Sequence, residues 1–409
     1  MKLLSRADAA VLATGRPVPL FTGDVAASQG TLLERLRDAR VLVIGGAGSI
    51  GAATVAELSR FPLAALHVVD TNENGLAELV RDLRGRPEGL AIADFRTLPV
   101  DFGAAFFRRF LETEAPYRYV LNFAAIKHVR SEKDVFSLLQ MFDTNLVKAD
   151  RLLGWLAARG GTSRYFCVST DKAANPVNLM GASKRLMEHV MFAHEGARAA
   201  GITLSSARFA NVAFSAGSLL EGWLLRLEKG QPLPVPRDTR RYFVSIREAG
   251  QLCLLAAVCA PDRTIVIPRL DESLLVALES VARRVLEAVE LTAVSYDDEG
   301  TARLAVPADR ARGAYPLLRT PLDTSGEKAF EEFVGAGEAT IEIGLPNLLA
   351  VSYKGVDAAA IAGLRDWVTT LAQDSHVSLP TKVVIVEAVS AVIPEFAHVE
   401  TNRQLDQRL

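Results

Sequence analysis

A glycine-rich turn between a short apolar strand and a helix constrains this chain more than any other feature. Residues 41–44 (VLVI) are apolar and β-rich, and Gly45, Gly48 and Gly51 then precede the helix-like stretch 52–60. Gly45 suits a tight turn, Gly48 lets the backbone approach a pyrophosphate, and Gly51 lets the helix pack closely on the sheet. The spacing predicts the first strand, turn and helix of a dinucleotide-binding fold, although a purely structural turn has the same composition.

Apolar strands and helices alternate after this turn. This pattern is typical of an α/β protein with a Rossmann-type doubly wound parallel sheet, followed by a smaller C-terminal substrate-binding portion. The expected strands are residues 65–69, 119–122, 165–168 and 203–209, and the expected helices are 146–159 and 182–199.

The alternation breaks down after about residue 210, where prolines become frequent, and this sets the expected domain boundaries. Residues 1–38 are expected to form an N-terminal helical segment. The nucleotide-binding domain is expected to cover 39–206 and about 244–268, and the substrate-binding domain 207–243 and 269–409 with a C-terminal extension. Within the later region we expect helices at 274–289 and 358–373 and strands at 339–343 and 382–386.

An acidic residue at the end of the second strand indicates the cofactor. Asp70 follows that strand about twenty residues after the glycine turn, where a carboxylate accepts hydrogen bonds from both adenosine ribose hydroxyls. Residues 71–74 contain no Arg or Lys for a 2′-phosphate, which favours NAD over NADP. Ser49 and Ile50 place helix N-terminal amides at the phosphates, and Asp101 is assigned to the adenine pocket. A helix N-cap is the alternative interpretation of Asp70, and the two roles are compatible.

Composition excludes several other classes of protein. A net charge of −2 gives no electrostatic footprint for nucleic acid. The longest uncharged apolar run, residues 252–260, is too short for a membrane span, and the N-terminus does not read as a secretory signal. Three cysteines without metal-ligand spacing and scattered histidines predict no metal site. We therefore expect a soluble cytoplasmic protein.

The segment 169–184 (STDKAANPVNLMGASK) is the most informative for chemistry. It begins at the carboxyl end of a predicted strand, where doubly wound folds bind their ligands. Asp171 and Lys172 place a carboxyl group beside an amine, a pair suited to general acid and base catalysis. A solvated loop with a fortuitous Asp-Lys pair is the alternative interpretation.

Taken together, seven motifs resemble the extended short-chain dehydrogenase/reductase superfamily. More narrowly, they resemble its polysaccharide-biosynthesis branch, the UDP-N-acetylglucosamine 4,6-dehydratases, from about Arg40 to Phe333. The motifs are 45–51 (GGAGSIG), 122–128 (NFAAIKH), Asn145, 169–172 (STDK), 208–211 (RFAN), 240–243 (RRYF) and 326–332 (GEKAFEE).

The resemblance implies an internal redox cycle on a UDP-sugar. Bound NAD takes hydride from C4, water is lost across C5 and C6, and the hydride returns to C6, giving a 4-keto-6-deoxy sugar nucleotide. Asp171 is then the acid that assists departure of the C6 hydroxyl and Lys172 the base at C5. Thr170 hydrogen-bonds the sugar near C4, Lys184 holds the nicotinamide ribose, and Ala124 contacts the cofactor. Similar enzymes are commonly dimers or larger, so we expect a homo-oligomer.

One departure from the superfamily concerns its Tyr-x-x-x-Lys pair. This chain has Met180 at the tyrosine position before Lys184, and a thioether carries no proton. Long, membrane-attached members of the branch resemble this chain in having Met there. The group that deprotonates the C4 hydroxyl is left unassigned, with Lys172, Asp171 and a water as candidates.

The remaining candidate residues are assigned to the substrate. They are Lys127 and His128 after the strand at 119–122, Asn211, Ser218, Arg241 as a diphosphate partner, and Glu327 for ribose hydroxyls. A salt bridge is the alternative for Lys127, a packed histidine for His128, and an acidic helix start for Glu327. The paired Glu331 and Glu332 are interpreted as a solvated face.

Two other functions compete with the dehydratase. One is another reaction on the same fold, either a nucleotide-sugar 4-epimerase or a dehydratase that also inverts C5. The other is a non-catalytic NAD-binding sensor, which only Met180 favours. Asp171 and Lys172 favour dehydration, because epimerisation at C4 needs no acid-base pair directed at C5 and C6.

Overall fold

The fold is described from a computed structural model. The description covers residues 4–127, 132, 134–321 and 331–399. His128 and Glu327, both assigned to the substrate from the sequence, lie outside these residues.

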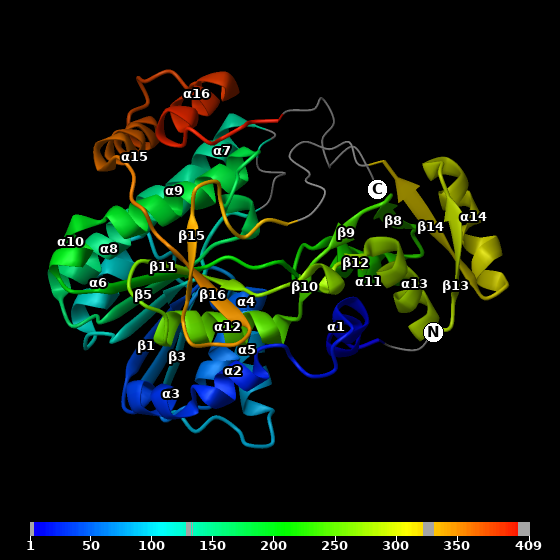
Figure 1. Ribbon diagram of the computed structural model, residues 1–409, viewed down its shortest axis with the longest axis horizontal. Helices are drawn as coiled ribbons and strands as arrows, with labels where there is room; N and C mark the ends of the chain where they lie inside the picture. The colour runs from blue at the N-terminus through cyan, green and yellow to red at the C-terminus, as the bar shows by residue number, and fades with distance from the viewer. Residues whose placement is uncertain (1–3, 128–131, 133, 322–330, 400–409) are drawn as a thin grey trace.

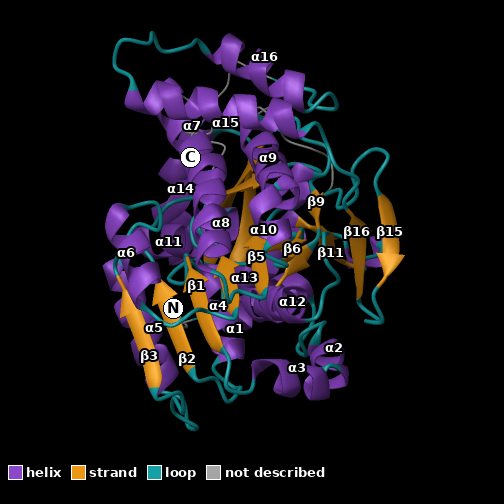
Figure 2. Cartoon of the chain, turned by 90° about the vertical axis from the view of Figure 1, so that its left-hand side faces the viewer, coloured by secondary structure: helices purple, strands orange, loops and turns teal. Residues whose placement is uncertain are grey.

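A nine-stranded sheet organises the larger part of the molecule (Figures 1 and 2). Its strand order is β15-β16-β11-β6-β5-β4-β1-β2-β3, and β1 to β6 and β11 run parallel. The chain winds outward from β1 in both directions, so the predicted doubly wound Rossmann-type sheet is confirmed. The strands are β1 (Arg40–Ile44), β2 (Ala65–Val69), β3 (Asp94–Leu98), β4 (Tyr119–Asn122), β5 (Arg164–Val168), β6 (Thr203–Ala207), β11 (Thr264–Pro268), β15 (Ala339–Glu342) and β16 (Leu348–Ser352).

Helices cover both faces of this sheet because its central strands are apolar on both sides. Val41 and Val43 of β1 pack into one hydrophobic cluster, and Leu42 and Ile44 pack into another. The first cluster involves α3 (Gln29–Leu36), α4 (Ser49–Leu58), α5 (Glu73–Arg84) and α12 (Ile246–Val258). The second involves α6 (Ala105–Thr113), α8 (Lys148–Arg159), α9 (Leu179–Ala193) and α10 (Glu195–Ala199).

A smaller region lies beside the large sheet, at the right of Figure 1. It contains a three-stranded parallel sheet of β8 (Leu233–Pro236), β13 (Thr292–Tyr296) and β14 (Ala314–Thr320). Three helices accompany it, α11 (Leu219–Lys229), α13 (Leu278–Ala288) and α14 (Glu299–Ala311), and α1 (Arg6–Thr14) packs into the same apolar cluster. Short strands β7 (Asn211–Val212), β9 (Arg240–Arg241), β10 (Phe243–Val244) and β12 (Val276–Ala277) form two further pairs.

The N-terminal residues are helical, as expected, but they do not form one unit. α2 (Thr22–Ala27) and α3 pack with the large sheet's helices, whereas α1 belongs to the apolar cluster of the smaller region. No helix among the described residues is long and apolar enough to cross a membrane.

The C-terminal region differs from the sequence-based expectation in two ways. β16 pairs antiparallel with β11, and β15 pairs antiparallel with β16, so both strands extend the large sheet, although the expected boundary placed 269–409 in the smaller region. Residues 382–386, predicted as a strand, begin helix α16 (Lys382–Val392). The β-branched run concealed a helical period, because Ile385, Val389 and Val392 are buried on one face.

The helices α15 (Ala358–Gln373) and α16 cover a third apolar surface. They pack against α9, α7 (Val135–Phe142) and the π-helical turn η2 (Asp143–Val147). This surface includes Met180 at the start of α9, so the C-terminal helices pack directly behind the segment predicted to carry the chemistry.

Candidate active site

A cavity of about 1510 Å³ lies at the carboxyl edge of the large sheet. Residues after β1, β2, β4, β5 and β6 line one side, and α11, β8 and the end of β14 line the other. Because β1 and β4 are neighbours whose connections leave in opposite directions, the cavity lies at the topological switch point, the usual ligand site of such a sheet.

The glycine turn forms one wall of this cavity. Gly45 has a positive φ of 76°, and a side chain there would place Cβ 2.5 Å from the Ala124 nitrogen. A Cβ on Gly51 would lie 2.3 Å from the Gly45 oxygen. Helix α4 begins after Gly48, which is its N-cap residue and has no side chain to cap the helix. Its first-turn residues Ser49 and Ile50 line the cavity, so the turn has the close approach and the helix N-terminus that a diphosphate requires.

Asp70 also lines the cavity, directly after β2. Its Oδ2 accepts a hydrogen bond from the Ala47 nitrogen (2.9 Å) and its Oδ1 from the Asn72 nitrogen (2.9 Å), which fixes the carboxylate. Asn72, and not Asp70, is the N-cap of α5. The alternative interpretation of Asp70 as that cap is therefore wrong.

Asp101 lies further along the same wall. Its carboxylate accepts hydrogen bonds from Lys148 Nζ (2.6 Å) and from the Gly103 nitrogen (2.8 Å), and both Asp101 and Ala124 line the cavity. The predicted cofactor residues from Gly45 to Ala124 are thus brought together along one side of the cavity.

The catalytic turn, which we define as residues 169–178, follows β5 and continues into α9. Residues Asp171–Ala173 form a single 3₁₀ turn, η3. Thr170 Oγ1 donates to Asp171 Oδ1 (2.6 Å), and Lys172 Nζ lies 3.4 Å from both Asp171 oxygens. Asp171 is buried, whereas the Lys172 side chain is 36% exposed. All three residues line the cavity, so the predicted acid-base pair is present as an ion pair and is not a fully solvated loop.

Lys184 lies within α9 at the floor of the cavity. Its Nζ donates to the Val168 oxygen at the end of β5 (2.6 Å) and contacts Met187 Sδ (3.3 Å). Burial lowers the pKa of this amine. The helix thus delivers a cation beside the last residue of the central strand, next to the catalytic turn.

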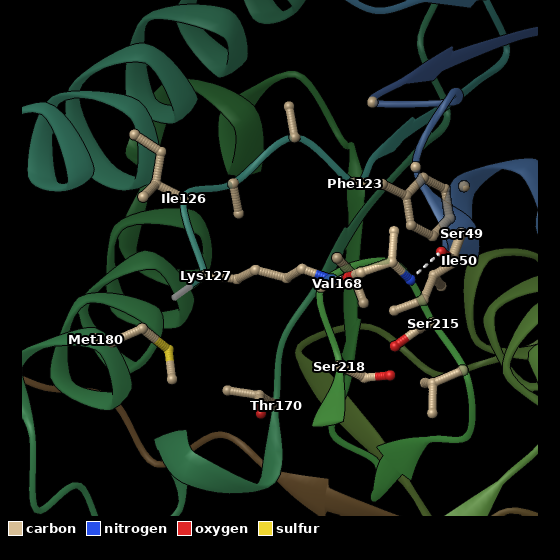
Figure 3. Close-up of a pocket in the computed structure, with 18 of the residues that line it drawn as sticks. Ser49, Ile50, Phe123, Ile126, Lys127, Val168, Thr170, Met180, Ser215 and Ser218 are labelled. Atoms are coloured by element: carbon tan, nitrogen blue, oxygen red, sulfur yellow. Dashed lines mark hydrogen bonds between the residues drawn. The ribbon is translucent and has the colours of Figure 1, made fainter. Parts of the chain in front are cut away.

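Met180 occupies the tyrosine position on the first turn of α9. Its side chain lines the cavity but belongs mainly to the apolar cluster under α15 and α16, and its backbone nitrogen donates to Glu132 Oε1 (2.9 Å). Figure 3 shows Met180, Thr170 and Lys127 around the same space. The thioether therefore packs at the position that the sequence resemblance assigns to a phenol.

Lys127 extends from the loop after β4 across the cavity (Figure 3). Its Nζ lies 3.5 Å from the Ala216 oxygen, and partial desolvation in the open cavity lowers the pKa of this amine. The Ala216 nitrogen donates to Ser49 Oγ (2.9 Å), so the 215–218 loop bridges the glycine turn and Lys127. The salt-bridge interpretation of Lys127 is not what the structure shows, because its hydrogen-bond partner is a carbonyl.

The other substrate assignments divide into two groups. Asn211 and Ser218 line the cavity, and Ser218 Oγ caps α11 by accepting from the Glu221 nitrogen (3.2 Å). Arg241 does not line it; its Nε lies 3.2 Å from Glu331 Oε1. The role of Arg241 as a diphosphate partner stays a prediction.

Glu331 is a residue that the sequence analysis misjudged. The predicted solvated face is wrong, because Glu331 is buried and accepts hydrogen bonds from Asn211 Nδ2 and the Tyr242 nitrogen (3.1 Å) in addition to its pairing with Arg241. Burial raises the pKa of its carboxyl group. The only sequence feature that pointed to Glu331 was the recurrence of acids in the GEKAFEE motif. The partners of Glu331 lie far away in the sequence.

A comparison with known families decides the membership of the chain. A family model described as "Polysaccharide biosynthesis protein" matches residues 41–352, which is most of the chain. The chain belongs to this polysaccharide biosynthesis family. The expected membership is confirmed at this level, and the helices α15 and α16 lie beyond the matched range.

Two curated relatives illustrate the similarity. An uncharacterised membrane protein of Methanocaldococcus jannaschii is 32% identical over 236 residues, covering 56% of this chain and 66% of that protein. The Bacillus subtilis protein named "Probable polysaccharide biosynthesis protein EpsC" is 28% identical over 263 residues, covering 63% and 41%. The chain thus spans less than two thirds of the length of these two relatives.

Solved structures show the same fold. The structure of Pen from Bacillus thuringiensis aligns with a TM-score of 0.63 at 20% identity, covering 82% of this chain and 98% of that chain. Bordetella bronchiseptica WbmF, solved in complex with NAD+ and UDP, aligns with a TM-score of 0.50 at 17% identity, covering 62% and 78%. At these sequence identities, the two comparisons show that this chain and those proteins have the same fold.

Proposed function

We propose that this protein is an NAD-dependent nucleotide-sugar 4,6-dehydratase that acts on UDP-N-acetylglucosamine for surface polysaccharide or glycan biosynthesis. The observation that carries the proposal is the Asp171-Lys172 ion pair, with Thr170 bonded to it, inside the cavity beside the glycine turn. Membership of a polysaccharide biosynthesis family supports the same class of substrate.

The residues around the glycine turn fit a bound dinucleotide. Gly45 and Gly51 leave no room for a side chain, and the N-terminus of α4 opens to the cavity. Asp70 would hold the adenosine ribose, and Lys184 the nicotinamide ribose. The chemistry that NAD supplies when bound is reversible hydride transfer, first from C4 and finally to C6 of the sugar.

The catalytic turn supplies the proton transfers of the elimination. Once C4 is a ketone, the proton on C5 is acidic, and Lys172 in its neutral form takes it. Asp171 in its protonated form gives a proton to the departing C6 hydroxyl, which leaves as water. After the elimination Lys172 is protonated and Asp171 is ionised. When the hydride returns to C6, Lys172 gives its proton back to C5, which completes the saturated C5–C6 bond.

The first proton transfer, from the C4 hydroxyl, needs a different acceptor from the superfamily's tyrosine. Met180 has no proton to exchange, so the acceptor is Asp171, Lys172 or a water molecule in the cavity. Thr170 donates a hydrogen bond to Asp171, and its proposed role is to hydrogen-bond the sugar near C4.

The direct test is incubation of the purified protein with a panel of UDP-, dTDP-, CDP- and GDP-sugars, followed by mass spectrometry and NMR. Loss of one water from an intact nucleotide sugar is expected with UDP-N-acetylglucosamine, and NMR then gives the configuration at C5. Inversion at C4 without loss of mass establishes a 4-epimerase instead. If NAD stays bound and no sugar changes, the function is instead that of a non-catalytic NAD-binding sensor.

A further inference from the structure

A segment far along the chain from the catalytic turn lies against it. This strap, which we define as residues 331–338, leads into β15 at the edge of the large sheet. It brings three carboxylates to three different elements around the cavity: Glu331 contacts Asn211 of β7, Glu332 contacts Asn175 of the catalytic turn, and Glu338 contacts Arg208 after β6.

Asn175 joins the catalytic turn to the strap through two hydrogen bonds. Its Nδ2 donates to Glu332 Oε2 (3.1 Å), and its Oδ1 accepts from the Ala336 nitrogen (2.9 Å). Between these two contacts the backbones meet closely, since a Cβ on Gly335 would lie 2.4 Å from the Ala174 oxygen. The side chain of Asn175 therefore fixes both the distance and the register between the strap and the turn.

A buried ionic network anchors the strap on its other side. Glu338 pairs with Arg208 (2.6 Å) and with Arg185, and Arg208 pairs with Glu188 (2.6 Å). Ser169, the first residue of the catalytic turn, donates to Glu188 Oε1 (2.6 Å). The strap and the first residue of the catalytic turn are therefore held by the same buried ionic network, which restrains both segments.

The C-terminal residues restrain the opposite side of the turn. The Ala397 nitrogen donates to the Pro176 oxygen (3.3 Å), and the Val399 nitrogen donates to the Val177 oxygen (3.0 Å). Residues 174–178 are therefore held between two segments of the C-terminal region. The η3 turn that carries Asp171 and Lys172 is three residues long; it directly precedes these residues and packs against the start of α9, where a Cβ on Gly181 would lie 2.5 Å from the Lys172 oxygen.

We propose that Asn175 and Glu332 are positioning residues that orient the Asp171-Lys172 pair for catalysis. The inference rests on the proposed function, because it assigns the strap to the same reaction. The polarity of the contact is defined: Asn175 gives an N–H to Glu332 and receives an N–H from Ala336. This polarity allows the contact to be broken and then rebuilt with its donor and acceptor exchanged.

The test compares Asn175→Asp, Glu332→Gln and the double variant. In Asn175→Asp the new carboxylate still accepts from the Ala336 nitrogen but opposes the carboxylate of Glu332. The kcat is therefore expected to fall about 10²-fold, the cost of a small misplacement, while KM changes much less. In the double variant the amide introduced at position 332 donates to the carboxylate introduced at position 175, and kcat is expected to recover most of that loss. Glu332→Gln alone is expected to lose less than Asn175→Asp, since its amide oxygen still accepts.

Asn347→Asp is the matched control. Asn347 Nδ2 donates to Asp24 Oδ2 (2.8 Å), the same kind of contact, and neither residue lines the cavity. This variant also opposes two carboxylates and is expected to lower the melting temperature without changing the kcat of the folded protein. Equal kcat losses in Asn347→Asp and Asn175→Asp would overturn the positioning role.

Backbone hydrogen exchange of residues 169–178, measured without substrate, gives a readout independent of turnover. Exchange is expected to accelerate in Asn175→Asp and to return toward the wild-type rate in the double variant. Wild-type exchange and kcat in Asn175→Asp, or a double variant no better than the single one, overturn the proposal. If the wild-type protein converts no sugar, the proposed function fails, and the exchange pattern alone decides whether the strap orders the turn.

Discussion

The glycine turn and the catalytic turn face the same cavity but are built in opposite ways. The glycine turn is fixed by its neighbours: the Gly45 nitrogen donates to the Val69 oxygen (2.7 Å), and Ala47 donates to Asp70. Asn175 and Pro176 in the catalytic turn are held by Glu332, Ala336 and Ala397, which are more than 150 residues away in the sequence. The glycine turn is therefore fixed by contacts that are close in the sequence, whereas the middle of the catalytic turn is fixed by contacts with the distant C-terminal region.

The largest effect is expected from the acid-base pair itself. Asp171→Asn or Lys172→Ala removes a proton carrier without touching the glycine turn, so turnover is expected to fall about 10²–10⁴-fold while bound NAD is retained. The measurement is product formation by mass spectrometry beside cofactor content of the purified protein. Asp366→Asn, at an exposed ion pair with Arg365, is the control and is expected to keep full turnover. Wild-type turnover in both site variants would refute the mechanism.

The converse change is Gly51→Ala, which alters the glycine turn instead of the acid-base pair. Its new Cβ would lie 2.3 Å from the Gly45 oxygen, so the turn must shift. Loss of bound NAD and a destabilisation of about 1–3 kcal/mol are expected, because close-packed backbone has no room for the methyl group. Cofactor content and thermal unfolding measure both effects.

Gly363→Ala is the matched helical control for this change. It lies in α15 with nothing within 4 Å of its Cβ, and it is expected to stabilise the protein by about 0.5–1 kcal/mol. Full cofactor content in Gly51→Ala would show that the glycine turn does not hold the dinucleotide.

The strap gives a pH-dependent prediction. Burial opposes ionisation of Glu338, but Arg208 and Arg185 outweigh it and lower its pKa to about 2. A lowered carboxyl pKa stabilises the fold above the ordinary pKa of 4.5, and this stabilisation is lost as the pH falls toward 2. Glu338→Gln is therefore expected to lower the melting temperature at pH 7 and to match the wild type increasingly below pH 4.5. A difference in melting temperature that does not change with pH would contradict this assignment.

The smallest effect is expected at Met180. Its side chain packs in the apolar cluster beneath α15 and α16, and a thioether transfers no proton. Met180→Leu conserves volume, so the free energy of unfolding is expected to change by less than about 1.5 kcal/mol. Turnover is expected to stay close to that of the wild type. A loss of turnover as large as that of Asp171→Asn would show that the sulfur contacts the reacting sugar.

Local sequence predicted the elements whose contacts are local. The run at 41–44, the glycines after it and Asp70 predict a strand, a turn and an acid at the end of the next strand within thirty residues, and the structure brings them together at the cavity. The strand β3, with the sequence DFRTL, was not predicted. No apolar run marks it, because it lies at the outer edge of the sheet, where its polar residues pair.

Residues with distant partners were predicted poorly. Glu331 looks like a solvated acid in the sequence, but the structure buries it against Asn211, Arg241 and Tyr242, which lie about 90 to 120 residues earlier. The contact of Arg241 with Glu331 was not predicted from the sequence, and the assignment of Arg241 to a phosphate stays a prediction. The β-branched run 382–386 was predicted as a strand because local propensity outweighed the helical spacing of its buried residues.

The separation between Asn175 and Ala336 has a consequence during synthesis. Their contact spans 161 residues. A ribosome adding about 5–20 residues per second needs on the order of ten to thirty seconds to cover that interval. Throughout it the nascent chain holds every residue of the glycine turn and Asp70 but lacks the strap that orders the catalytic turn. Each newly made molecule is therefore able to acquire its dinucleotide site well before it acquires an ordered acid-base pair.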